Sequence, residues 1–321
     1  AGASAPPAFS AIAQGLRRRR DHRQPGLAVL SCDNIVHNGG AARVAVLGAA
    51  DDLEPGLADW IEQNVTFPSS MVDRITPATT AEDRETLAGE YGVADRWPVV
   101  AETFTQWVIE DDFPLGRPPW EDVGVLMTDD VEPYEQLKLR VLNAGHSCLA
   151  YLAALAGHTY VHEVVADDLF RTYLRCFYDE EAVPALPAVP GVDVEEYKRR
   201  VVQRFSNPKI RDTVSRLCLD GSAKFPKFLV PTVEAQLDRG SSVKWSALAL
   251  AGWCSYLVGI ADDDSPLELA ADPDLANARA LAAESLSDPA RFLSYRRVFG
   301  DDLADNARFR SAFVDALSKL R

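Results

Sequence analysis

Three polar side chains in one apolar stretch are of types that could do acid–base chemistry together. Lys138, Asn143 and His146 fall within a predicted long helix that begins at Pro133 and ends at Gly157. Proline suits the first turn of a helix, and glycine suits its C-terminal end. At about 100° per residue, Asn143 is rotated by about 140° from Lys138 and His146 by about 80°. We therefore expect an ammonium, an amide and an imidazole on one side of this helix.

The neighbours of these side chains are apolar. They are Leu137, Leu139, Val141, Leu142 and Leu149. They leave little of the helix circumference free for water, which weakens the alternative interpretation of a solvated polar face. A buried lysine with a depressed pKa is a common general base, and asparagine and histidine can hold a substrate oxygen beside it.

The spacing of the three residues also resembles the catalytic helix of a known family. Lys-x4-Asn-x2-His, as it stands over residues 138–146, resembles the mannitol dehydrogenase family, the polyol-specific long-chain dehydrogenases that use NAD without a metal. Three further stretches resemble the same family in the same order: residues 31–39, 65–77 and 207–226. Each match alone is modest, but the four together extend over most of the chain.

The resemblance implies a role for each residue of a catalytic set. Lys138 would be the general base, and Asn34 and Asn143 would form the pair that stabilises the oxyanion. His146 would orient the substrate hydroxyls. The alternative for Asn34 is a simpler one, in which it caps the helix that follows it.

The resemblance also implies residues for the rest of the substrate and for the cofactor. They are Asp73, Arg216 and Lys224 for the remaining hydroxyls of a linear polyol, and Val72 for the nicotinamide site. Each of the three polar residues could instead have a purely local role. Asp73 could pair with Arg74, and Lys224 could be an exposed lysine after a glycine turn. Arg216 could pair with Asp212 at i,i+4, which contributes only about 0.3–0.5 kcal/mol.

The pattern of apolar residues predicts an α/β fold plus an all-α part. The short apolar run at residues 27–30 is typical of a buried parallel strand, and residues 97–109 and 123–126 are also strand-like. Helical periods dominate from residue 133 onward. The family resemblance then implies the C-terminal part of a Rossmann-like cofactor domain over residues 1–130 and a mainly helical substrate domain over residues 131–321.

Several helices can be placed more closely. Residues 8–20 and 55–63 are helical by pattern, and residues 245–260 read as a core helix too short to span a bilayer. Asn207 followed by Pro208 predicts a helix start. The last 50 residues predict two or three helices, separated near residues 288–289 and 300–301.

The sequence has no phosphate-binding turn. A dinucleotide-binding unit needs a strand, a G-x-G-x-x-G turn, a helix and an acidic residue about 20 residues later. Gly39-Gly40 and Gly48 do not supply this pattern. In the resembled family that unit precedes the point where this sequence starts, so we expect the N-terminal part of the Rossmann domain to be absent. The chain alone should then bind NAD weakly or not at all, and NADP is not excluded as the cofactor.

Charge and cysteine content limit the partners. A net charge of −15 opposes binding to nucleic acid. Five scattered cysteines in apolar surroundings indicate reduced thiols and a cytoplasmic protein. We expect no membrane partner, and the resemblance implies a monomer whose partner is a small polyol or ketose.

A metal site is the main competing hypothesis. His158 and His162 lie at i,i+4, which on one helix is a ligand spacing. Glu163 follows the second histidine, however, unlike the order in H-E-x-x-H. Asp167 and Asp168 are only plausible third ligands, so we predict no metal.

The predicted function is that of an NAD-dependent polyol dehydrogenase acting on a mannitol-like alcohol and a fructose-like ketose, with a lysine base. One alternative is a keto-uronate reductase, resembling fructuronate reductase, on the same scaffold. That activity needs a further cation, which the sequence does not locate. The other is a catalytically inactive fragment without the cofactor turn.

Overall fold

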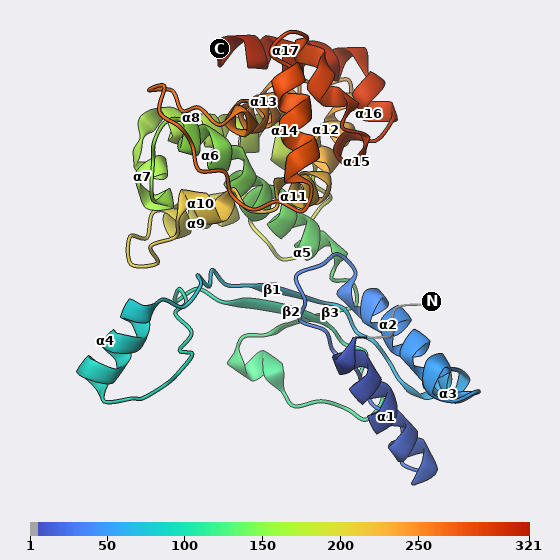
Figure 1. Cartoon of the computed structure of the whole chain (residues 1–321). Coiled ribbons are helices and arrows are strands. Elements are labelled where there is room, and N and C mark those ends of the chain that lie inside the picture. The colour runs from blue at the N-terminus through green and yellow to red at the C-terminus, as the bar shows by residue number, and fades with distance from the viewer. Residues whose placement is uncertain (1–5) are drawn as a thin grey trace. The chain divides into compact units, whose positions relative to one another are not determined.

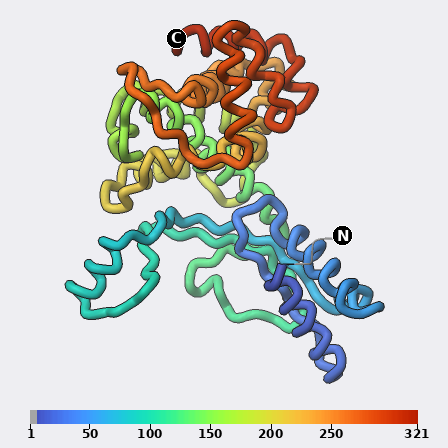
Figure 2. Tube along the Cα trace, viewed as in Figure 1, coloured from blue at the N-terminus to red at the C-terminus, as the bar shows by residue number. Residues whose placement is uncertain are grey.

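The computed structural model describes residues 6–321 (Figure 1). The chain divides into two compact units. Unit 1 contains residues 1–74 and 103–135, and unit 2 contains residues 75–102 and 136–321. Figure 2 follows the trace by colour, in which the segment 75–102 interrupts unit 1 along the chain.

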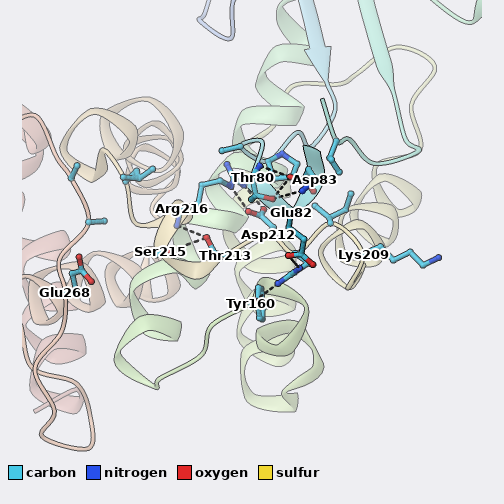
Figure 3. Close-up of a pocket in the computed structure, with 18 of the residues that line it drawn as sticks. Thr80, Glu82, Asp83, Tyr160, Lys209, Asp212, Thr213, Ser215, Arg216 and Glu268 are labelled. Carbon is cyan, nitrogen blue, oxygen red and sulfur yellow. Dashed lines mark hydrogen bonds and ion pairs between the residues drawn. The ribbon is translucent and has the colours of Figure 1, made fainter. Parts of the chain in front are cut away.

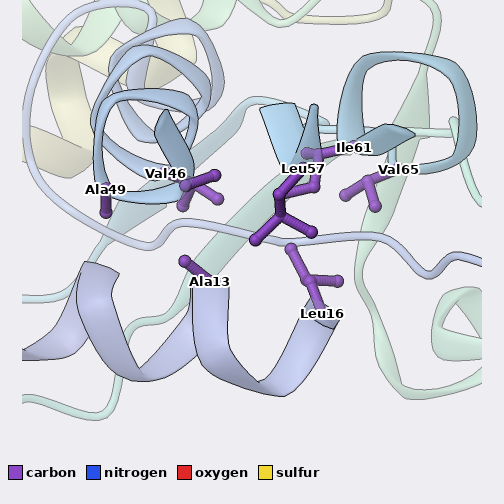
Figure 4. Packing of buried hydrophobic residues seen from close by; sticks show 8 residues of the cluster. Ala13, Leu16, Val46, Ala49, Leu57, Ile61 and Val65 are labelled. Atoms are coloured by element: carbon purple, nitrogen blue, oxygen red, sulfur yellow. The ribbon is translucent and has the colours of Figure 1, made fainter. Parts of the chain in front are cut away.

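Three helices form the apolar core of unit 1 (Figure 4). They are α1 (Pro7–Asp21), α2 (Asn38–Leu53) and α3 (Leu57–Asn64). Leu16 of α1, Val46 of α2 and Ile61 of α3 are buried against one another in this cluster. The helices expected at residues 8–20 and 55–63 are therefore confirmed. Arginines in the last turn of α1 match the negative end of the helix dipole.

Unit 1 also holds a three-stranded sheet in the order β1-β2-β3. β1 (Ser70–Asp73) pairs antiparallel with β2 (Gln106–Glu110), which pairs parallel with β3 (Leu126–Thr128). The register places Ser70 opposite Ile109 and Val108 opposite Leu126.

The sheet corrects three strand predictions. Within the described residues 6–321, residues 27–30 form only a single parallel bridge, between Ala28 and Thr66, and not a strand. Only residues 106–109 of the predicted 97–109 strand are in the sheet, and Trp97 and Val99 are exposed. The strand expected at 123–126 begins at Leu126, after a 3₁₀-helix, η1 (Trp120–Val123), that ends at Gly124. Strand-like composition needs a hydrogen-bonding neighbour to become a strand.

The segment 75–102 carries α4 (Ala81–Tyr91). Thr80 and Asp83 form a capping box at its start, and Gly92, with φ 66°, ends it. No residue of α4 is buried.

A continuous helical segment runs from α5 (Glu132–Leu137) through a π-helix, η2 (Lys138–Asn143), into α6 (Ala144–Leu155). The other helices of unit 2 follow in chain order. They are α7 (Val161–Ala166), α8 (Asp168–Phe177), η3 (Tyr178–Ala182, a second π-helix), η4 (Val183–Ala185), α9 (Val194–Phe205), α10 (Val214–Leu217), α11 (Gly221–Phe228), α12 (Val230–Asp238), α13 (Lys244–Val258), α14 (Leu275–Glu284), η5 (Pro289–Ser294), α15 (Arg296–Phe299), α16 (Asp302–Asp305) and α17 (Ala307–Lys319).

Helix α13 lies at the centre of unit 2 and packs against α6, α14 and α17. Gly252 allows the close approach to α6, since a Cβ there would lie 2.7 Å from Cδ2 of Leu152. Trp253 packs among buried rings, tilted against Phe225 and edge-on to Phe292. The predicted core helix at 245–260 is therefore confirmed. In the part of the chain described here, no helix has the length and apolarity needed to cross a membrane.

The separations predicted near residues 288–289 and 300–301 are confirmed, because η5 starts at Pro289 and α15 ends before Gly300. The predicted number of two or three helices is wrong, since five helices, α14, η5, α15, α16 and α17, lie in residues 272–321. The predicted helix start at Asn207-Pro208 is wrong, because those residues enter a turn. Arg211 then takes a left-handed conformation, φ 51°, which interrupts any helix. The next helix, α10, starts at Thr213, whose hydroxyl accepts from the backbone N–H of Arg216.

Candidate active site

The predicted catalytic helix is continuous, but its centre is wound differently from an α-helix. Lys138 and Asn143 are the first and last residues of the π-helix η2. In a π-helix each backbone N–H bonds to the carbonyl five residues earlier, so Asn143 lies about one turn beyond Lys138. The predicted rotation of about 140° between them is therefore wrong, and the two side chains share one face more closely than expected.

Both side chains are buried, as their neighbours predicted. Lys138 is 7% exposed and Asn143 is 9% exposed. His146 lies three residues after Asn143 on α6, where side chains at i and i+3 are neighbours. The structure therefore brings the ammonium, the amide and the imidazole together along one helical segment.

His146 is enclosed by an aromatic ring and a carboxylate. Its imidazole stacks on Phe205 of α9, with ring centroids 4.0 Å apart, and its Nε2 lies 3.9 Å from Oδ2 of Asp212. Burial lowers the pKa of His146 to about 3, although the Asp212 carboxylate opposes that shift. The imidazole is thus neutral in the folded protein near neutral pH and can orient a hydroxyl without adding a charge.

The lowered pKa of His146 predicts a pH-dependent stability. In the unfolded chain this imidazole takes up a proton near pH 6.5, whereas in the folded chain it does so only near pH 3. The free energy of unfolding should therefore fall by up to about 1.4 kcal/mol per pH unit from this group as pH drops between those values. Urea denaturation at several pH values would show a shallower slope for His146→Gln than for wild type. A His22→Gln variant, at an exposed position, is the control, and equal slopes in all three proteins would contradict the assignment.

Arg216 and Asp212 form the local ion pair that the sequence allowed. Nε and Nη2 of Arg216 each lie 2.5 Å from a different Asp212 carboxylate oxygen. The Arg216 side chain is still 37% exposed. Lys224 of α11 is half-buried, so the alternative of an exposed lysine after a glycine turn does not hold. Its Nζ lies 3.4 Å from the Leu217 carbonyl. Burial and the nearby Arg216 lower the pKa of Lys224.

Asp212 and Arg216 also line a cavity of about 750 Å³ within unit 2 (Figure 3). Arg211, Glu82 and Tyr160 also line this cavity, and Nη1 of Arg211 donates to Glu82 at 2.8 Å. Sequence reasoning missed these lining residues. Glu82 is 129 residues from Arg211, and no local pattern signals a pair at that separation.

The remaining predicted residues lie in unit 1. Asn34 is exposed in the loop before α2, and it does not cap that helix, because the N-cap is His37. Val72 and Asp73 lie on β1, where Asp73 is buried. The roles of these residues stay predictions.

Asn38, which the sequence did not single out, ties the Asn34 loop to β1. Its amide donates to the Asp33 and Ser70 carbonyls, at 3.0 and 2.7 Å, and accepts from the Ser70 N–H at 2.9 Å. This buried side chain therefore fixes the loop of Asn34 beside the strand that carries Val72.

The two histidines of the metal hypothesis do not share a helix. His158 follows Gly157 in a loop, with its Nε2 4.0 Å from Asp167, while His162 lies on α7. The i,i+4 ligand geometry assumed for one helix is therefore wrong. Among residues 6–321 there is no group of three or more histidine, cysteine or carboxylate side chains arranged to hold a metal ion.

Two family models match the chain. One is the mannitol dehydrogenase Rossmann domain, over residues 1–122, and the other is the mannitol dehydrogenase C-terminal domain, over residues 130–321. The first match does not bear out the expectation that the N-terminal part of the Rossmann domain is absent.

Named relatives and solved structures agree with these matches. A mannitol 2-dehydrogenase of Phaeosphaeria nodorum is 43% identical over 97% of this chain and 55% of its own length. One from Cereibacter sphaeroides is 43% identical over 97% of the chain and 64% of its own length. The chain thus spans less than two thirds of these relatives.

Among solved structures, a Pseudomonas fluorescens mannitol 2-dehydrogenase in ternary complex with NAD and D-mannitol has a TM-score of 0.86 and 42% identity, covering 98% of this chain and 63% of that one. A substrate-free D-sorbitol dehydrogenase has a TM-score of 0.89 and 34% identity, covering 98% and 64%. With a Rossmann-like part and a mainly helical part that both match, the chain belongs to the mannitol dehydrogenase family.

Proposed function

We propose that the protein is an NAD-dependent polyol dehydrogenase that interconverts a mannitol-like sugar alcohol and a fructose-like ketose. The observation that carries the proposal is that the buried Lys138 and Asn143 lie on one helical segment with His146, whose side chain is 12% exposed. The similarity to an enzyme solved with NAD and D-mannitol supports it. NADP is the alternative cofactor.

Each residue has a role in that reaction. Lys138 accepts the proton of the reacting hydroxyl, and Asn143 and Asn34 donate hydrogen bonds to the developing alkoxide. His146, held neutral by burial, orients a neighbouring hydroxyl. The further hydroxyls are bound by Asp73, Arg216 and Lys224.

The chain's own residues suit the nicotinamide end of the cofactor. Val72 offers a half-buried apolar side chain on β1, and Asn38 holds the Asn34 loop beside that strand. NAD, when bound, supplies the hydride acceptor. We assign cofactor binding to residues 1–130 and substrate binding to residues 131–321. We further propose a cytoplasmic monomer whose partners are the polyol and the ketose, and neither a nucleic acid nor a membrane.

Two alternatives give different results in a direct assay. Oxidation of mannitol with production of NADH supports the polyol dehydrogenase. Reduction of a keto-uronate by NADH without mannitol oxidation would indicate the fructuronate reductase-like activity. Neither reaction, together with no NAD binding by calorimetry, would indicate a catalytically inactive fragment.

Metal independence follows from a lysine base. Because Lys138 removes the hydroxyl proton, no Lewis acid is needed, and EDTA should leave the rate of polyol oxidation unchanged. Loss of activity with EDTA that zinc restores would contradict this. A His158→Ala variant would then show whether that histidine is a ligand.

A further inference from the structure

The carboxylate of Asp212 is shared by two residues of the proposed site. It is 6% exposed, binds Arg216 through both of its oxygens, and has Nε2 of His146 3.9 Å from Oδ2. Figure 3 shows Asp212 and Arg216 side by side on the cavity wall. A buried carboxylate in this place restricts the orientation of the guanidinium beside it.

The backbone fixes where this carboxylate lies. The Asp212 carbonyl accepts from the N–H of Val161 at 2.9 Å, and Thr213 pairs with Tyr160 across an isolated antiparallel bridge. Thr213 also caps α10, the helix that carries Arg216. Asp212 is therefore held between the segment before α7 and the start of α10, four residues before the arginine it binds.

The pairing uses one complete edge of the guanidinium. A carboxylate is best bound by two parallel N–H groups of arginine, and Asp212 takes the Nε and Nη2 pair. The exposed part of Arg216 can still donate a hydrogen bond to a hydroxyl. Arg211, the other arginine of the cavity, is paired with Glu82 at 2.8 Å.

We propose that Asp212 is a positioning residue that holds Arg216 and makes the site select uncharged polyols over polyhydroxy acids. The proposal rests on the proposed function, in which Arg216 contacts substrate. With Asp212 in place, the Arg216 guanidinium offers the substrate single N–H donors instead of a paired edge. Its positive charge is balanced by the Asp212 carboxylate. Lys224 is a further cation near Arg216, and burial and Arg216 lower its pKa.

The test compares two substrates of equal length in wild type and Asp212→Asn, a hexitol and the matching hexonate, both oxidised with NAD. Asparagine keeps the shape but turns an N–H₂ group toward the guanidinium, which frees Arg216 and leaves its charge unbalanced. For the hexitol, we expect KM to rise roughly 10- to 100-fold with a smaller change in kcat, the range for losing one charged hydrogen bond. The ratio of kcat/KM for hexonate over hexitol should rise at least about 10-fold.

Three further variants separate positioning from simple damage. Asp212→Glu keeps the charge and should keep the preference for the hexitol. Asp168→Asn removes another carboxylate, which is exposed and paired with Arg171. It should change kcat and KM for neither substrate. Adding Asp212→Asn to Arg216→Ala should leave the hexitol KM of Arg216→Ala unchanged, because Asp212 acts through that arginine.

The outcomes that overturn the proposal are distinct. If Asp212→Asn lowered kcat/KM equally for both substrates, Asp212 would be only a structural residue. If kcat and KM were unchanged for both, Asp212 would have no role in the site. A wild-type protein that oxidises no hexitol would overturn the proposed function and this inference with it.

Discussion

Replacing Lys138 by alanine is expected to lower kcat for polyol oxidation by about 10²- to 10⁴-fold, the contribution typical of a positioned general base. The side chain is 7% exposed within an apolar helical segment, so little water can reach it to take over the proton. The affinity for NAD, measured by calorimetry, should change little. Small primary amines added to the variant should restore part of the rate, since they supply the missing base.

Lys227→Ala is the matched control, because this lysine is exposed on α11. It should leave both kcat and KM near the wild-type values. If Lys138→Ala kept a near-normal kcat and showed only a raised KM, Lys138 would be a binding residue. His146 would then be the first candidate for the proton acceptor.

Replacing Glu102 by alanine is expected to destabilise the protein by about 3–5 kcal/mol, the usual cost of removing one partner of a buried ion pair. Glu102 is 4% exposed and Arg204 of α9 is 7% exposed. Nη2 of Arg204 lies 2.7 Å from Oε1 of Glu102, and its Nε lies 3.0 Å from Oε2. The same carboxylate accepts from the N–H of Ile75 at 2.6 Å. This pair therefore holds both ends of the segment 75–102 against the helices of unit 2.

Urea denaturation would measure the loss, with Glu82→Ala as the control. Glu82 pairs with Arg211 at an exposed site, where such a pair contributes about 0–1 kcal/mol. A double variant, Glu102→Met with Arg204→Met, should recover much of the stability, because no buried charge remains. A loss for Glu102→Ala no larger than that for Glu82→Ala would show that the buried pair does not stabilise this segment.

The sequence predicted the components of the site better than the way they are wound and paired. Apolar neighbours correctly predicted that Lys138 and Asn143 are buried, because burial depends on local pattern. The π-helix was not predictable, since its i→i+5 bonds arise where packing demands them. Gly145, just beyond it, is so close to Tyr178 that a Cβ would lie 2.2 Å from the phenolic oxygen.

The sequence pattern did not predict which residues far apart in the chain form ion pairs. Glu102 and Arg204 are 102 residues apart, and no sequence pattern around either residue predicts that they pair. The strand predictions failed for a related reason. Residues 97–105 have the composition of a strand, but among residues 6–321 no strand pairs with them, and composition alone cannot supply a partner.

The π-helix has a consequence for how the chain tolerates changes in length. Six residues, Lys138 to Asn143, set the angular phase between the helical turns before and after them. Deleting one of these residues would let the segment relax to an α-helix. The turns on its two sides would then rotate relative to each other by an angle approaching about 100°. Since α6 is fixed by its packing on α13, the part of the segment that carries Lys138 would be the part that rotates. The direction of this lysine is therefore set by the number of residues in the segment, so a single deletion would disturb the site as much as a substitution within it.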